Sequence, residues 1–167
     1  MSRTFHRRHW LALAAAADSY ARARLAGHPV IALLVGKAMS GAFLAHGYQA
    51  NRLIALRDPG VMVHAMGKAS AARVTLRSVE ELEQLAASIP PMAYDIDNYA
   101  SLGLLWETLS VTQIEQPQAQ DLAAVRQVLC AAIDDIGRSG RDLGGRLGAR
   151  HRAASARVRQ LLREQWS

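Results

Sequence analysis

The sequence has little of what identifies several common classes of protein. It contains one cysteine, so neither a disulfide nor a cysteine-based metal site can form within the chain. No apolar run approaches the roughly 20 residues that would span a bilayer. Aromatic residues make up only 5% of the chain, and they do not alternate with basic residues as on many nucleic-acid-binding faces. These absences argue against a disulfide-stapled, membrane-spanning or nucleic-acid-binding protein.

What the chain does have is enough apolar sequence for one core. Half of its 167 residues are hydrophobic, which suits a single domain. Basic residues near the start precede the run LALAAAA, as in a secretory signal, but this run is short and continues into the amphipathic stretch DSYARARLAGH. We therefore expect a helix over residues 9–26, ending at Gly27, in a soluble, cytoplasmic protein. Cys130, in the apolar pattern VRQVLCAAI, is expected to be a small core residue.

Lysine and arginine outnumber aspartate and glutamate by 20 to 14, a net charge of +6. The excess lies in RTFHRRH near the start and in the last thirty residues, where arginines run from Arg138 to Arg163. A net positive charge favours binding of acidic partners such as phosphorylated cofactors or carrier proteins. The C-terminal arginines are either a solvated helix face and loop, or a surface that docks an acidic carrier protein or a partner subunit.

The hydrophobic pattern predicts an α/β layer fold, in which helices and buried strands share one core. Strands are predicted at residues 30–35, 51–56 and 61–66. The first of them is continuously apolar and is expected to be buried on both faces. Helices are predicted over residues 42–50, 69–76, 79–88, 121–137 and 153–166, with a short one inside 93–109. Ser78 is a candidate N-cap, and Gly137 is an expected helix stop. In the polar and aromatic residues 94–99 we favour a turn stabilised by Asx hydrogen bonds over a subunit contact.

One stretch invites a functional explanation: GKAMSGAFLAHG, residues 36–47, directly after the first strand. It is not a phosphate-binding P-loop. That pattern needs glycine at position 31 and serine or threonine at position 38, where this chain has Ile31 and Ala38. Small residues instead stand at the start of a helix, where the backbone N–H groups of Gly41 and Ala42 lack intrahelical acceptors. Such a pair of donors can hold an anion or a developing oxyanion. The alternative is that these small residues only permit close packing.

Three blocks in order carry a resemblance to a known family: PVIALLVGKAMSGAFLAHGYQANRLIAL, VMVHAMGKASAARVT and VEELEQLAASIPPMAYDIDNYASLGLLWETL. From about Trp10 to the C-terminus, the chain resembles the gamma subunit of biotin-independent malonate decarboxylase, which is related to the carboxyltransferase components of acetyl-CoA carboxylase in the crotonase superfamily. The resemblance implies a partial ClpP/crotonase-like spiral of βαβ turns with C-terminal helices. Residues 1–167 would then be a single crotonase-like domain, the C-terminal portion of a longer family domain, with 121–167 as a helical extension within it.

The resemblance also implies a carbon-carbon lyase subunit that is inactive without its beta partner. In the implied reaction, a malonyl group held as a phosphopantetheine-type thioester on an acyl-carrier subunit loses CO2 and leaves an acetyl thioester. Biotin is not used, and this chain itself holds no cofactor. No metal is expected either, because His46 and His64 are not spaced as a ligand pair.

The resemblance places specific residues in the site. The amides of Gly41 and Ala42 match the oxyanion-hole position of the related carboxyltransferases. Many relatives have glycine at the position of Ala42, but alanine has the same backbone N–H and can donate in the same way. They are expected to face the carboxylate or CO2 side at the beta-gamma interface. His46 is either an acid or donor at the site or a structural histidine. The expected substrate-binding residues are Ser40, Phe43, Met66, Gly67 and Lys68, the last of which is otherwise a solvated lysine.

Two other functions stay open. One is the carboxyltransferase half of an acyl-CoA carboxylase, which requires biotin on a partner. The other is a non-catalytic, truncated assembly subunit that keeps the interface without a complete site. The HAMGKASAARVT block and the absence of extended glycine-rich CoA-site features favour the decarboxylase.

Overall fold

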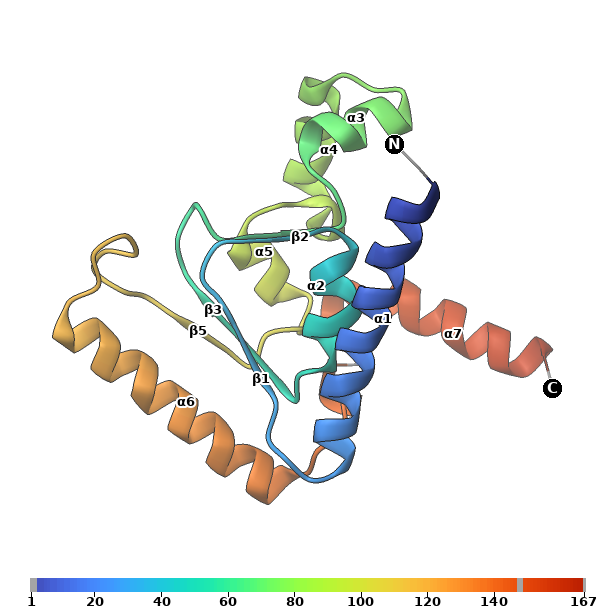
Figure 1. The fold of residues 1–167 in the computed structure, drawn as a ribbon. Helices are drawn as coiled ribbons and strands as arrows, with labels where there is room; N and C mark the ends of the chain where they lie inside the picture. The colour runs from blue at the N-terminus through green and yellow to red at the C-terminus, as the bar shows by residue number, and fades with distance from the viewer. Residues whose placement is uncertain (1–2, 147–148, 167) are drawn as a thin grey trace.

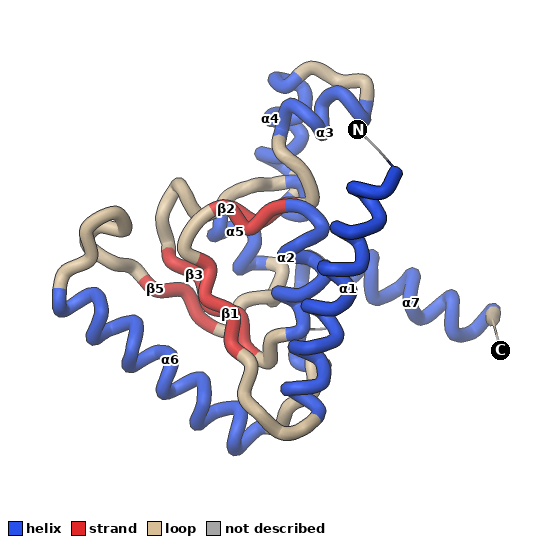
Figure 2. Tube along the Cα trace, viewed as in Figure 1, coloured by secondary structure: helices blue, strands red, loops and turns tan. Residues whose placement is uncertain are grey.

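The computed structural model describes residues 3–146 and 149–166 of the chain. Two small parallel sheets lie among helices (Figures 1 and 2). The first sheet has the strand order β1-β3-β5, and the second pairs β2 with β4. The strands are β1 Ile31–Leu34, β2 Lys37–Met39, β3 Arg52–Leu56, β4 Met62–His64 and β5 Glu107–Leu109. The structure is therefore mixed α/β, as the hydrophobic pattern predicts.

The chain passes twice from a strand of the first sheet to a strand of the second sheet and then into a helix. β1 leads into β2 of the second sheet, and α2 (Ser40–His46) then returns the chain to β3 of the first. β3 leads in the same way into β4, which α3 (Lys68–Thr75) follows. Both pairings are parallel, with Met39 opposite His64 in the second sheet. The carboxyl ends of β2 and β4 therefore meet at one edge, together with the starts of α2 and α3.

Helices cover the sheets from two sides. α1 packs along α2, and α6 contacts β1 (Figure 1). α3 and α4 pack against each other around Ala71, Ala72 and Leu82. The remaining helix bounds are α1 Arg3–Leu25, α4 Val79–Ser88, α5 Ile96–Ser101, α6 Ala119–Ser139 and α7 Ala153–Gln165, with 3-10 helices at 47–49, 90–92, 144–146 and 150–152. Among the helices of the described residues, none is both long and apolar enough to cross a bilayer.

The main core is built on β3, the central strand of the first sheet. Leu53, Ile54 and Ala55 are completely buried, because the strand has a neighbour on each edge and helices nearby. Continuous burial of this kind is typical of a parallel strand. Burying a side chain the size of leucine contributes roughly 1.5–3 kcal/mol, so this strand is a main source of stability.

Several predicted boundaries are confirmed. α1 ends before Gly27, whose φ of +96° lies in the left-handed region that glycine occupies without strain. α4 spans residues 79–88 and begins with a capping box: Glu81 N donates to Ser78 Oγ (3.1 Å), and Ser78 N donates to Glu81 Oε2 (2.8 Å). Asp95 accepts the Asn98 N–H (2.9 Å), so the predicted Asx hydrogen bond forms, but it caps the helix α5 instead of stabilising a separate turn.

Two strand predictions need correction. The run 30–35 is not buried on both faces: residues 31–33 are half-buried and Val35 is 55% exposed. The reason is that β1 is an edge strand with only β3 beside it. Two further strands were not predicted: β2 lies directly after Gly36, and the segment 93–109 ends in β5. Three-residue strands form through their partners, and they are too short to show a period of two.

Two predictions for α6 are also wrong. Gly137 does not stop the helix, which continues to Ser139 and ends at Gly140, where φ is +91°. Cys130 is exposed rather than in the core. α6 buries Ala132 and Ile136 on one narrow face, and Cys130 lies outside it.

Candidate functional site

The stretch around Gly41 lies where β2 ends and α2 begins. Ser40 has a φ of +70°, a left-handed conformation that costs a residue with a side chain about 1–2 kcal/mol. The residues after it turn into the right-handed α2, so the amides of Gly41 and Ala42 have no acceptor within the helix. Strained residues of this kind cluster at ligand-binding turns. The strain at Ser40 thus marks the same position that the sequence singles out.

The space beside these amides is open. A Cβ built on Gly41 would meet no heavy atom within 4 Å, and the same holds for Gly67. Gly41 does not have the positive φ that favours glycine, and Ala42 is exposed. Neither the backbone conformation nor packing among the described residues therefore requires glycine at position 41. Close approach of a ligand or a partner subunit would explain a glycine at this position.

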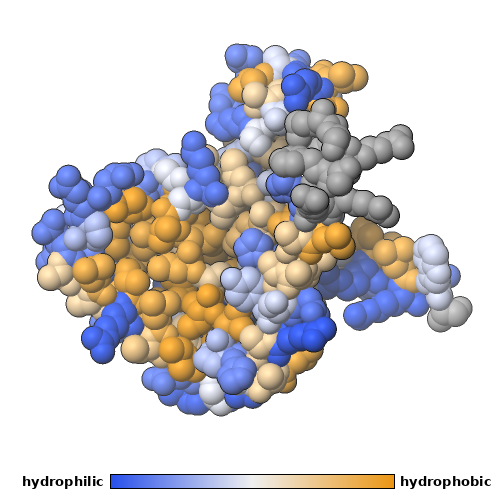
Figure 3. Space-filling view, in the orientation of Figure 1, coloured by the Kyte–Doolittle hydropathy of each residue, from blue (hydrophilic) through white to orange (hydrophobic). Residues whose placement is uncertain are grey.

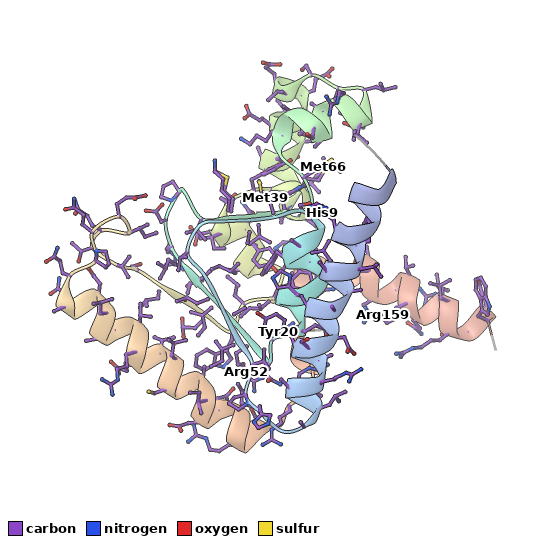
Figure 4. The ribbon with its side chains drawn as sticks, in the orientation of Figure 1. His9, Tyr20, Met39, Arg52, Met66 and Arg159 are labelled. Atoms are coloured by element: carbon purple, nitrogen blue, oxygen red, sulfur yellow. The ribbon has the colours of Figure 1, made fainter. Side chains whose placement is uncertain are left out.

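The loop after β4 lies at the same edge. Met66 stands near Met39 and the end of β2 in Figure 4, as the parallel pairing of Met39 with His64 requires. The Tyr94 hydroxyl donates to the Met66 carbonyl (3.1 Å), and its ring stacks on His64 with centroids 4.0 Å apart. Lys68 is paired with Glu83 (Nζ to Oε1, 2.7 Å), so it is not simply a solvated lysine. Tyr94 therefore holds the loop that carries Met66, Gly67 and Lys68.

Burial shapes the ionisation of this stacked pair. It lowers the pKa of His64, partly offset by the hydrogen bond to Met66, so the neutral imidazole is favoured. Burial also raises the pKa of Tyr94, while the nearby Lys68 ammonium opposes that change. Both shifts favour the uncharged form of each ring.

The rings of two predicted site residues make contacts within the chain. The His46 ring stacks on Tyr20 of α1, with centroids 5.7 Å apart, and its buried Nδ1 has no hydrogen-bond partner in the described part of the chain. Phe43 is buried in the core and meets Tyr48 edge-to-face at 5.3 Å. The structure therefore gathers Ser40, Gly41, Ala42, Met66, Gly67 and Lys68 at one edge, whereas the rings of Phe43 and His46 pack within the chain. Sequence reasoning missed the contact of His64 with Tyr94, because no periodicity relates residues thirty positions apart.

An apolar groove of about 520 Å³ runs from this edge along the first sheet. Its lining includes Met39 and Ala42 from the edge of the second sheet, and β1 supplies much of the remaining lining. On the face drawn in Figure 3, hydrophobic residues gather over the strands between α6 and α1. The groove is lined by Tyr20, residues 30–39, Ala42, Phe43, His46, Gly47 and Ala50.

A second cavity of about 360 Å³ has a polar wall in which the central charges are already paired. Arg52 binds Asp135 of α6 (Nε to Oδ2, 2.6 Å) and donates to Ser139 Oγ (2.7 Å). The hydrogen bond from Arg52 lowers the pKa of Asp135. Buried Asn51 accepts from Val30 N and donates to the Arg141 carbonyl, both at 2.9 Å. This cavity is best explained as the junction that fastens α6 and the following loop to β3.

The described residues, 3–146 and 149–166, contain no group of three or more His, Cys, Asp or Glu side chains that could hold a metal ion.

Fold and site together define an α/β protein with a ligand-accessible edge, formed by backbone amides at the carboxyl ends of parallel strands. Ligand sites in open α/β sheets occur at such ends. The chain belongs to the malonate decarboxylase gamma subunit family, whose model matches residues 10–166. Membership in this family confirms the resemblance to a malonate decarboxylase gamma subunit that the three sequence blocks indicate.

Individual relatives agree with the family. The chain is 35% identical over 135 residues to the malonyl-S-ACP:biotin-protein carboxyltransferase MADD of Malonomonas rubra, covering 76% of this chain and 46% of that protein. A chain of a Pseudomonas malonate decarboxylase hetero-tetramer, solved in complex with coenzyme A, is 76% identical with a TM-score of 0.87. A chain of the Pseudomonas MdcD-MdcE hetero-dimer is 70% identical with a TM-score of 0.81. The two matches each cover 93% of this chain but 59% and 57% of the solved chains, so this chain spans less than two thirds of their length.

Proposed function

We propose that this chain is the gamma component of a cytoplasmic malonate decarboxylase, and that the amides of Gly41 and Ala42 form one of its oxyanion holes. The observation that carries the proposal is the open edge of the second sheet, where strained Ser40 precedes two amides without helical acceptors. The beta subunit would complete the site across this edge. An acyl-carrier subunit would deliver the malonyl group as a phosphopantetheine-type thioester.

The reaction suits a site made largely of backbone. When the bond between the α-carbon and the carboxylate breaks, its electron pair moves into the thioester as an enolate, and CO2 leaves. Protonation of the α-carbon then gives the acetyl thioester. Preorganised N–H donors at the thioester oxygen stabilise the enolate charge that develops there, and one such donor is typically worth about 100- to 1000-fold in rate. Donors at the carboxylate bind and orient that group before it leaves as CO2. We assign the carboxylate or CO2 side to Gly41 and Ala42, and binding roles to Ser40, Met66, Gly67 and Lys68.

The chain path supports the finer fold assignment as well. Two successive turns, β1-β2-α2 and β3-β4-α3, place matching strands in the same two sheets. A repeated turn of this kind is what a crotonase-like spiral would contain. We therefore propose that the chain is part of such a spiral, with α6 and α7 as its helical extension.

A carboxyltransferase role is the second candidate, because the Malonomonas relative is named as a biotin-protein carboxyltransferase. The two functions differ in the fate of the carboxyl group. A decarboxylase releases it as CO2, whereas a carboxyltransferase passes it to biotin on a partner. A non-catalytic assembly role is the third possibility, and it predicts complex formation without either reaction.

The test is reconstitution. The chain is co-expressed with the candidate beta subunit and carrier, and CO2 release from the malonyl-carrier thioester is measured with and without this chain. We expect turnover that depends on the chain and is insensitive to avidin, which sequesters biotin. Turnover that appears only after a biotin-bearing partner is added, and that avidin inhibits, would establish the carboxyltransferase. A stable complex without turnover both with and without that partner would establish the assembly role.

A further inference from the structure

The net charge of the molecule is concentrated in its last thirty residues. Residues 138–167 contain eight arginines and two acidic residues, which equals the net charge of +6 of the whole chain. The last helix, α7, extends away from the body of the molecule, and Arg159 is labelled on it in Figure 4. α7 itself carries three arginines and one glutamate, a net charge of +2, and the other arginines of this segment precede it.

α7 also has an apolar strip between its arginines. At 100° per residue, Val158 and Leu162 lie on one side of the helix, with Leu161 beside them. Val158 is 57% exposed and Leu162 is 47% exposed, so this strip is not covered by the rest of the chain. The same spacing places Arg157 at one border of the strip and Arg159 at the other.

The charges at these borders are available. The ion pairs among the described residues involve Arg22, Arg52, Arg57 and Lys68, and none involves Arg157, Arg159 or Arg163. An apolar strip flanked by unpaired positive charge is complementary to a helix with its own apolar strip flanked by aspartate and glutamate. A nucleic acid backbone would satisfy the charges but leave the apolar strip uncovered.

We infer that α7 is the docking helix for the acyl-carrier subunit, which it recognises through an acidic amphipathic helix. The inference rests on the proposed function, since only a thioester carrier has to bind and leave in every turnover. α7 has 13 residues and is therefore only about 20 Å long, which limits it to a small contact. Small, charged contacts suit transient partners, whereas permanent subunits bury larger and more apolar surfaces. Long-range attraction would also speed the encounter.

Binding of the carrier without any acyl group tests this inference independently of catalysis. The purified complex of this chain with the beta subunit is titrated with fluorescently labelled carrier at 50 and 300 mM salt. The anisotropy of the label gives the Kd for the carrier. For the triple variant R157E/R159E/R163E we expect at least tenfold weaker binding at 50 mM salt and a smaller change of Kd with salt. For V158A/L162A we expect weaker binding with the salt dependence retained.

The matched control reverses three exposed arginines elsewhere, R73E/R77E/R126E, and changes the net charge by the same amount. Its Kd should stay within about twofold of that of the unchanged chain. Equal losses in both triple variants, or none in the α7 variant, would overturn the inference. So would preferential binding of α7 to vesicles containing phosphatidylglycerol rather than to the carrier. Carrier binding that depends on α7 in a complex without turnover would retain the inference and reject the proposed function.

Discussion

At the residue scale, the candidate site depends on a few backbone positions rather than on reactive side chains. Ser40 accepts a left-handed conformation that an L-residue normally avoids, and the chain then turns into α2. Gly41 has open space where a side chain would lie. A substitution there can therefore block a ligand without disturbing the fold, which makes Gly41 the sharpest test of the site.

We predict that Gly41→Val lowers the rate of decarboxylation by about 100- to 1000-fold, a loss as large as that from removing one oxyanion donor, because the donors can no longer be reached. The valine side chain would occupy the space that a ligand oxygen needs, while its own N–H is kept. Turnover of the reconstituted complex measures the effect. Gly41→Ala, with its smaller side chain, should lose less.

Folding must be unchanged for this result to be meaningful. No heavy atom lies within 4 Å of a Cβ at position 41, so we expect the same thermal midpoint and the same complex by gel filtration. A folded Gly41→Val complex with normal turnover would refute the assignment of the oxyanion hole.

For His46→Gln we predict a loss of less than about tenfold, below the roughly 100-fold expected for a general acid. The His46 ring stacks on Tyr20 of α1, so the change mainly affects the packing of α1 on α2. The kcat of the complex is compared with its thermal midpoint. A fall in kcat as large as that of Gly41→Val, without a fall in the midpoint, would make His46 catalytic.

At the element scale, helix ends and short connections hold the sheets in place. Asp121, in the first turn of α6, is buried and accepts hydrogen bonds from the N–H groups of Thr112 and Gln118, both at 2.9 Å. These two bonds tie the connection after β5 to the helix that contacts β1. They also lower the pKa of Asp121, with the bond from Thr112 contributing most.

We predict that Asp121→Asn destabilises the chain at pH 7 and that the difference shrinks on acidification. The pKa of Asp121 is lower in the folded chain than in the unfolded one. Its contribution to stability is therefore complete above the unfolded value of about 4 and is lost as the pH falls through the folded value. Urea midpoints at pH 7 and pH 3 measure the effect.

Asp134→Asn is the control, because Asp134 is an exposed carboxylate on the same helix. Its urea midpoints should differ little from those of the unchanged chain at either pH. A loss for Asp121→Asn that is the same at pH 7 and pH 3 would show that packing, rather than the carboxylate, accounts for the effect.

At the scale of the whole molecule, one side is apolar and one end is basic. β1 is an edge strand beside a groove of about 520 Å³, and Val35 next to it is 55% exposed. Large exposed apolar surfaces mark interaction sites in soluble proteins. This distribution agrees with a chain that works inside a hetero-oligomer.

We predict that the chain made alone self-associates and binds the dye anilinonaphthalene sulfonate at this face. Co-expression with the beta subunit should lower the dye fluorescence and give a defined complex, because the apolar surface is then covered. Light scattering and fluorescence measure both effects. A monodisperse isolated chain without dye binding would contradict the prediction.

Sequence reasoning succeeded where local chemistry decides the structure. The capping box at Ser78 and the Asx cap at Asp95 involve residues three apart, so the printed sequence contains both partners. The apolar residues 53–56 within the segment 51–56 likewise predict β3, because a central parallel strand needs apolar residues on both faces. The same argument failed for 30–35, since the number of neighbouring strands is not encoded in the strand itself.

The sequence by itself determined the α/β class, the main helices, the family and the small residues around Gly41. Only the tertiary structure decided that β2 and β5 exist, that Cys130 is exposed, and that Tyr94 holds the loop after β4. It also decided that the starts of α2 and α3 share one open edge, whereas the rings of Phe43 and His46 pack within the chain. The physical reason is that caps and hydrophobic periodicity act over a few residues, whereas strand pairing, ring stacking and exposure depend on segments far apart in the sequence.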